Sequence, residues 1–157
     1  MAQTLICDCS SAGSVLIQIT TLIVVIIGWY VINRHNNKRE KRREVRTQLD
    51  SFISLVSDIE KNSVKYHIEQ DHNEEIARTI KRNIGALRKF AIRLNLLDTN
   101  ILNRSNINLN RAITMKNFDN GENHIPESEN GELIAGIYSV CDDFVEAMES
   151  GYNKIYK

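Results

Sequence analysis

An uninterrupted apolar stretch runs from Val15 to Ile32, with the sequence VLIQITTLIVVIIGWYVI. Its eighteen residues carry no charge, and twelve of them are Val, Leu or Ile. At a helical rise of about 1.5 Å per residue it extends about 27 Å, close to the roughly 30 Å hydrocarbon core of a bilayer. Trp29 and Tyr30 stand near one end, as aromatic side chains do at membrane interfaces. The stretch therefore predicts one transmembrane helix over residues 15–32.

Two other structures contain apolar stretches of this kind: a cleaved signal peptide and a fully buried helix of a soluble protein. The signal peptide is disfavoured because no basic segment precedes Val15, and because the stretch is long for the apolar part of such a peptide. The buried helix stays open as the alternative to a membrane span.

The flanking charges indicate the orientation of the span. Residues 1–14 hold one charged residue, Asp8, whereas residues 33–46 hold seven basic and two acidic residues, a net charge of +5. The basic residues are Arg34, Lys38, Arg39, Lys41, Arg42, Arg43 and Arg46. Because Lys and Arg are enriched on the cytoplasmic side, we expect a short external tail and a cytoplasmic C-terminus at the inner (cytoplasmic) membrane. The basic juxtamembrane segment would also attract anionic lipid headgroups.

Two features of the N-terminal part suggest self-association. Cys7 and Cys9 lie in the expected external tail, where disulfides can persist. They are too close for an easy internal bridge, so we expect either a bond between two copies or free or modified thiols. Small and polar residues also share one face of the span: Ser14, Gln18, Thr21, Val25 and Gly28. This face is a candidate contact between copies, unless Gln18 lies shallow enough to reach water.

Residues 47–157 predict one small all-α cytoplasmic domain. Apolar residues recur at alternating spacings of four and three from Val45 to Ile59, and Ser63 and Tyr66 continue the pattern. The expected helices span residues 44–68, 74–97, 106–118 and 128–150. No run of alternating apolar residues predicts a strand.

An antiparallel bundle of three main helices and a short fourth would bury these apolar faces. The first stripe would also suit a coiled coil between subunits, although it lasts only about three heptads. Asp71 or Asn73 is the expected cap of the second helix, and Gly151 the expected stop of the last. Residues 119–130 predict an exposed loop and the best candidate for a mobile or partner-specific segment.

Motifs for chemistry are few. The sequence holds no Gly-rich phosphate loop, no nucleophile elbow and no HExxH pair. Its four histidines are scattered, and the apolar neighbours of Cys141 favour a core residue over a nucleophile. We therefore predict no catalytic, metal-binding or cofactor-binding residues. Nucleic acid is an unfavourable partner, since residues 47–157 hold thirteen basic and seventeen acidic residues.

These features favour a single-pass, membrane-tethered, non-enzymatic adaptor that binds an unknown protein partner, or a second copy of itself, at the inner membrane surface. The main alternative is a small membrane-active effector, such as an oligomerising toxin, a holin-like protein or an exclusion protein. An enzyme with an unfamiliar site is a third alternative, which would need convergent polar groups at inward positions.

Overall fold

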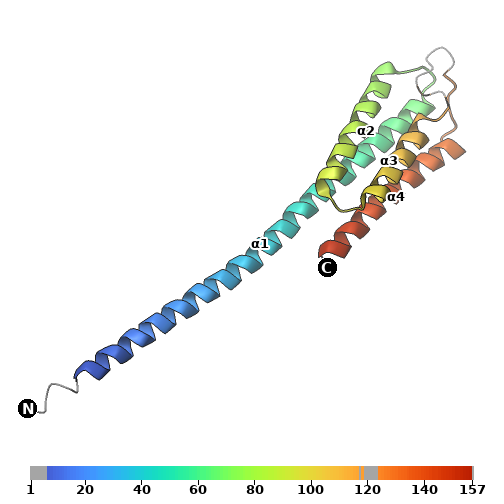
Figure 1. Cartoon of the computed structure of the whole chain (residues 1–157). Helices are drawn as coiled ribbons and strands as arrows, with labels where there is room; N and C mark the ends of the chain where they lie inside the picture. Colours follow the sequence, from blue (N-terminus) through green and yellow to red (C-terminus); the bar gives the residue numbers. More distant parts are fainter. Residues whose placement is uncertain (1–6, 117, 119–123, 157) are drawn as a thin grey trace, which may run out of the picture. The chain divides into compact units, whose positions relative to one another are not determined.

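A computed structural model describes the backbone of residues 7–116, 118 and 124–156, and the side chains in these ranges from residue 15 onward. Within the described ranges the chain is all-helical, as predicted, with no strand. Its helices are α1 (Cys7–Ile68), α2 (Glu74–Leu94), α3 (Thr99–Thr114) and α4 (Glu132–Tyr156) (Figure 1). The chain divides into two compact units, Met1–Arg43 and Glu44–Lys157.

The first unit contains the apolar part of α1. The large apolar side chains between Val15 and Ile32 are 47% to 69% exposed, and none is buried against another part of the chain. An eighteen-residue window here has a mean hydropathy of 2.4. By length and composition, α1 is thus one helix able to cross a membrane.

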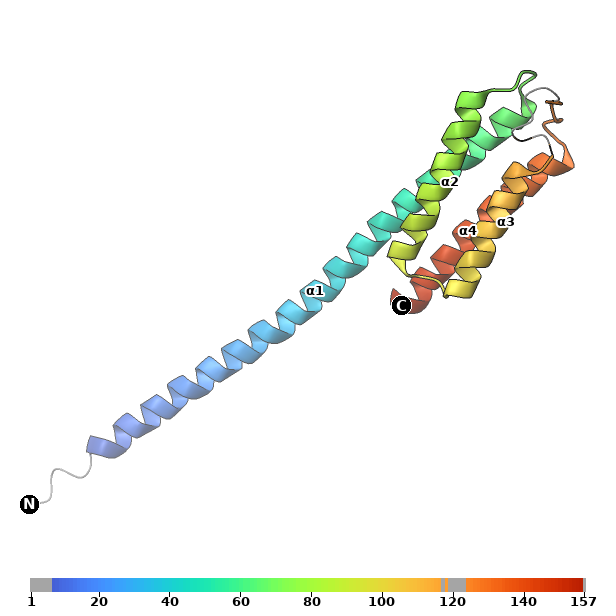
Figure 2. The same ribbon diagram turned by 45° about the horizontal axis from the view of Figure 1, so that its top comes forward.

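The second unit is a four-helix bundle with up-down-up-down topology. The C-terminal part of α1 lies beside α2, and α3 lies beside α4, in both ribbon views (Figures 1 and 2). Phe52 of α1 stands at the centre of the core, with ring centroids 5.2 Å from Phe144 of α4 and 6.3 Å from Phe90 of α2. The apolar stripe of α1 is buried inside its own bundle, in agreement with the bundle interpretation.

The connection from α1 to α2 agrees with the sequence pattern. Helix α1 ends at Ile68, as expected, and the Asn73 side chain caps α2 by accepting a hydrogen bond from the Ile76 N–H at 3.1 Å. Helix α2 ends at Leu94 instead of residue 97, because Asn95 adopts a left-handed conformation with φ of 50°.

Helix α3 differs most from the expected helix over residues 106–118. It begins at Thr99, where the Asp98 carboxylate accepts a hydrogen bond from the Asn100 N–H at 2.8 Å, and it ends at Thr114. Its buried residues are Leu102, Asn106, Leu109 and Ile113, at spacings of four, three and four. The buried positions follow the helical period, but Asn106 occupies one of them. The polar residue interrupts the apolar pattern in the sequence.

Helix α4 runs from Glu132 to Tyr156, so the expectation that Gly151 ends it was wrong. Gly151 is a buried residue inside the helix. A Cβ atom there would clash with the carbonyl oxygen of Leu96 and lie 3.0 Å from the carbonyl carbon. Gly151 therefore marks a close approach between two backbones and not a helix end.

Candidate functional site

The predicted membrane-facing residues lie on one exposed helix. Trp29 and Tyr30 are 67% and 59% exposed on α1. Going toward the bundle, Tyr30, Arg34, Lys38 and Lys41 follow at spacings of four, four and three, so an aromatic ring and three cations share a face. The other basic residues of the first unit, Arg39, Arg42 and Arg43, are exposed on the same helix.

The candidate self-association face of the span is only partly described. The Thr21 hydroxyl donates to the Ile17 carbonyl at 2.8 Å, so it is satisfied within its own helix. A Cβ built on Gly28 would meet no atom within 4 Å. The side chains of Cys7, Cys9 and Ser14 lie outside the described residues. The contact through Gln18 and the bond between cysteines therefore stay predictions.

Arg46 belongs to the bundle, although the sequence placed it with the lipid-facing cations. Its guanidinium lies 3.0 Å from the carboxylate of Asp50 and 3.4 Å from that of Glu149, and 5.8 Å from the ring centre of Tyr152. Arg46 thus connects α1 to α4.

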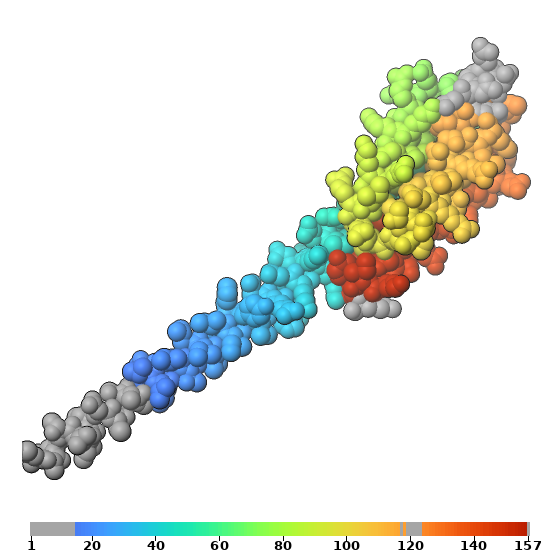
Figure 3. Space-filling view, in the orientation of Figure 1, coloured from blue at the N-terminus to red at the C-terminus, as the bar shows by residue number. Residues whose placement is uncertain are grey.

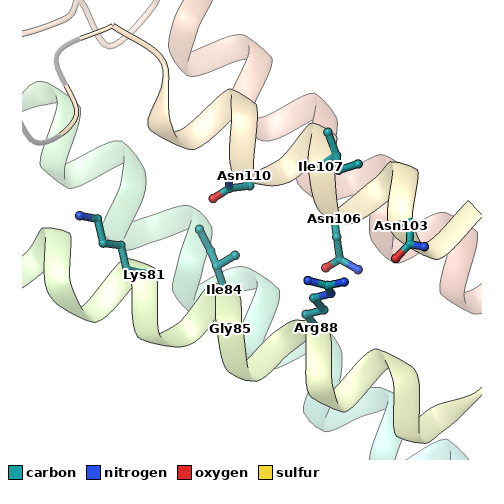
Figure 4. Close-up of a pocket in the computed structure, with 8 residues that line it drawn as sticks. All are labelled: Lys81, Ile84, Gly85, Arg88, Asn103, Asn106, Ile107 and Asn110. Atoms are coloured by element: carbon teal, nitrogen blue, oxygen red, sulfur yellow. The ribbon is translucent and has the colours of Figure 1, made fainter.

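A groove of about 580 Å³ lies between α2 and α3 (Figure 4). Its lining residues are Lys81, Ile84, Gly85 and Arg88 of α2, and Asn103, Asn106, Ile107 and Asn110 of α3. The α2 side presents two cations, and the α3 side presents three carboxamides at spacings of three and four. The two helices meet on the face of the bundle shown in Figure 3.

Asn106 is the buried polar group of this groove, with 8% of its surface exposed. Its amide nitrogen donates to the Leu102 carbonyl at 2.9 Å. Its carboxamide oxygen has no hydrogen-bond partner in the part of the chain that the structure describes. Figure 4 shows the Asn106 side chain directed toward the groove, opposite Arg88. Because an unsatisfied buried acceptor costs about 1–3 kcal/mol, this oxygen is a candidate ligand contact.

The charges of the bundle are segregated by helix. Helix α2 carries six basic and two acidic residues, and α3 carries two basic and no acidic residues. Helix α4 carries five acidic residues and one basic residue. The groove is therefore the electropositive part of a domain with a net negative charge, and its electrostatics favour an anionic ligand.

A second cluster lies at the C-terminal end of α1, and we call it the aromatic–histidine cluster. Its members are Tyr66, His67, His72, Phe118 and His124. The Tyr66 hydroxyl and the His72 Nδ1 atom are 2.9 Å apart, and the His124 Nε2 atom lies 3.0 Å from the Glu69 carbonyl oxygen. Sequence reasoning missed this cluster because one histidine enters it from the segment after α3.

His67 is the most buried histidine of the cluster, and its Nε2 atom lies 2.9 Å from the Ile113 carbonyl oxygen. Since a carbonyl only accepts, this contact assigns the proton to Nε2. Burial lowers the pKa of His67, which keeps the ring neutral. Among the described residues, no group of three or more His, Cys, Asp or Glu side chains could hold a metal ion.

The predicted loop 119–130 is partly anchored to α1. The Glu127 N–H donates to the His67 carbonyl at 2.7 Å, and the Glu127 carboxylate lies 2.5 Å from the Lys116 ammonium. Residues 119–123 lie outside the described residues. The described residues 124–130 are mostly exposed, as predicted, and Glu127 connects them to α1.

Cys141 is a core residue, as predicted. Its thiol is 1% exposed, and burial, with Glu60 and Asp142 nearby, raises its pKa to about 12. A thiol with this pKa is almost entirely protonated at neutral pH, so it is a poor nucleophile.

Sequence spacing alone identifies each wall of the groove but not the groove. Lys81 and Arg88 are seven residues apart and share a helix face, while Asn103, Asn106 and Asn110 share another. That the two faces oppose each other is a property of the tertiary structure.

Comparison of the chain with protein-family models, with curated proteins and with solved structures found no match.

Proposed function

We propose that this protein is a single-pass, membrane-tethered adaptor whose helical bundle binds a partner protein at the inner face of the cytoplasmic membrane. One observation supports this most: residues 15–32 expose a continuous apolar surface, while the bundle buries the apolar stripe of its own helices. A soluble protein rarely leaves so large an apolar surface uncovered. Lipid around the helix would cover it.

The basic residues support the proposed orientation. Arg34, Lys38 and Lys41 lie beyond Tyr30 on one face of α1, where they would meet anionic headgroups if the interface lies near Tyr30. Arg46 forms ion pairs with Asp50 and Glu149, so it is part of the bundle.

Tethering gives such an adaptor its physical advantage. A partner confined to the same surface meets the bundle at a raised effective concentration, so modest affinity suffices. The alternative of a membrane-active effector would need a polar surface along the span. Gln18 is the only amide side chain there, and the hydroxyls of Thr20 and Thr21 are bonded within the helix.

The tether is tested with the full chain carrying a C-terminal fluorescent reporter that matures only in the cytoplasm. We expect the fluorescent protein in the membrane fraction. Alkaline carbonate should not extract it, and detergent should dissolve it. A variant in which an unrelated span replaces residues 15–32 should behave identically, whereas deletion of residues 1–32 should release the bundle. A full chain that is soluble without detergent, or a C-terminus outside the cytoplasm, would overturn the proposal.

A further inference from the structure

Asn106 occupies a core position of α3 although its side chain is polar. It is 8% exposed, and it shares the buried face of the helix with Leu102, Leu109 and Ile113. Its amide nitrogen donates to the Leu102 carbonyl, and its carboxamide oxygen has no donor among the described residues. Exchanging the two atoms would set two acceptors against each other, so the unpaired atom is the oxygen. Packing does not explain Asn106, because an apolar residue of similar size would leave no buried acceptor unpaired.

Gly85 of α2 lines the same groove, and packing does not explain it either. Glycine is unfavourable inside a helix, and a close neighbour normally accounts for its presence. Here a Cβ atom built on Gly85 would meet no atom within 4 Å, so the missing side chain only widens the groove. The volume of about 580 Å³ is that of a small-molecule site and is far larger than one phosphate or carboxylate group.

Arg88 supplies the groove with a cation that forms no ion pair in the described part of the chain. Its side chain is directed toward α3, opposite Asn106 (Figure 4). A guanidinium binds an oxyanion through two parallel hydrogen bonds. A carboxylate uses both of its oxygens in this way, whereas a phosphate monoester keeps a third oxygen. The amides of Asn103 and Asn110, about one turn before and after Asn106, could donate to that oxygen.

The Asn106 oxygen requires a hydrogen-bond donor from the ligand. A phosphate monoester is mainly a dianion at neutral pH, because its second pKa is about 6, so the donor must come from another group of the molecule. Hydroxyl groups both donate and accept, as carboxamides do, so a row of hydroxyls matches a row of asparagines. The C–H groups between the hydroxyls would contact Ile84 and Ile107, which also line the groove.

From these features we infer that the groove between α2 and α3 binds a small phosphorylated polyol, such as a sugar phosphate. Arg88 would hold the phosphate, Asn106 would accept a hydrogen bond from a hydroxyl, and Asn103 and Asn110 would bind the neighbouring oxygens. The same chemistry, a phosphate monoester beside hydroxyls, also occurs in the headgroup of a phosphorylated inositol lipid. This inference goes beyond the proposed adaptor function and concerns the bundle alone, so its failure would leave the membrane tether in place.

The test uses the full chain in detergent micelles and myo-inositol 1-phosphate, with phosphorus NMR as the readout and empty micelles as the blank. We expect saturable binding. Cyclohexyl phosphate has the same ring and phosphate without the hydroxyls, and it should bind about tenfold more weakly or worse. Inorganic phosphate should also bind about tenfold more weakly, since it lacks the polyol. Absence of binding by myo-inositol 1-phosphate, or equal binding by either control, would overturn the inference.

Arginine variants locate the phosphate in the groove. Arg88→Gln should weaken the binding of myo-inositol 1-phosphate about tenfold or more, because the ligand loses a charge-assisted pair of hydrogen bonds. The matched control Arg82→Gln removes a charge of α2 outside the groove and should change the affinity less than about twofold. Equal effects of the two variants would indicate general charge attraction and contradict the site.

Asn106→Leu separates a binding role from a structural role. Leucine has a similar size and no unpaired oxygen, so the urea midpoint of the bundle should stay unchanged or rise while binding weakens about tenfold or more. A lower midpoint with unchanged binding would assign Asn106 to packing and overturn the inference. Gly85→Leu should fill the groove and abolish binding without lowering the midpoint. Full binding by the folded Gly85→Leu variant would place the ligand elsewhere and overturn the site.

Competition identifies the source of the phosphorylated polyol. Phosphatidylinositol 4-phosphate, added to the micelles, should displace myo-inositol 1-phosphate if the groove takes a lipid headgroup. Failure to displace it would identify a soluble compound as the ligand. Both results support the same recognition chemistry, provided that the displaced signal depends on Arg88. Displacement that is unchanged in Arg88→Gln would contradict binding in the groove.

Discussion

The backbone of Gly151 lies directly against the carbonyl group of Leu96. A Cβ atom on Gly151 would stand 3.0 Å from the Leu96 carbonyl carbon and 3.2 Å from Cδ2 of Leu97. The C-terminal part of α4 thus packs on the connection between α2 and α3 without an intervening side chain. A side chain at position 151 would therefore hold α4 farther from this connection.

Gly151→Ala should destabilise the bundle, because the added methyl group meets backbone atoms that cannot rotate away. We expect the free energy of unfolding to fall by about 1–3 kcal/mol, the usual cost of overpacking. Urea titration of the full chain in micelles would measure this, with labelling of the buried Cys141 thiol as the readout in a Cys7→Ser, Cys9→Ser background. A gain in stability would contradict the close approach.

Gly85→Ala is the matched control, with the opposite expected sign. Nothing lies within 4 Å of its Cβ position, so the substitution removes the helix penalty of glycine at no steric cost. We expect the free energy of unfolding to rise by about 0.5–1 kcal/mol. The same Cys141 labelling would measure it, and a loss of stability would show that Gly85 has a structural role in α2.

The aromatic–histidine cluster should make the bundle sensitive to acid. Burial lowers the folded-state pKa of His67 below its ordinary value of 6.5, so between these two values the unfolded chain binds more protons than the folded chain. The contribution is complete above pH 6.5 and is lost as the pH falls through 6.5 toward the depressed folded-state pKa. Unfolding of the full chain, followed by Cys141 labelling between pH 5 and pH 8, should show this decline.

His67→Gln is the control for that pH dependence. The Gln side chain can still donate to the Ile113 carbonyl, but it does not titrate, so the decline below pH 6.5 should flatten. Lys116, Glu127 and His124 surround the same ring and are unchanged by the substitution. An unaltered pH profile in His67→Gln would assign the acid sensitivity to another group.

Cys141 should react with alkylating reagents only when the bundle opens. Its pKa of about 12 and its burial keep it protonated and covered at neutral pH. In the Cys7→Ser, Cys9→Ser background we expect iodoacetamide to modify the native chain at least a hundredfold more slowly than the urea-unfolded chain. Rapid labelling of the native chain by mass spectrometry would refute the buried position.

Local sequence patterns predict a large part of this structure. The apolar block from Val15 to Ile32, the spacing that builds α1 and the cap at Asn73 could all be predicted, because each depends on residues close together in the chain. The core position of Cys141 followed from its apolar neighbours in the same way. Periodicity and capping are properties of a single helix.

Other features required the folded bundle. Asn106 hid the start of α3, since a polar residue occupies a core position there, and Gly151 resembled a helix stop until its contact with Leu96 was visible. The groove between α2 and α3 and the cluster around Tyr66 join residues from separate helices. Such pairings depend on the rotation and offset of each helix against its neighbours, which packing of the whole core sets and no single segment encodes.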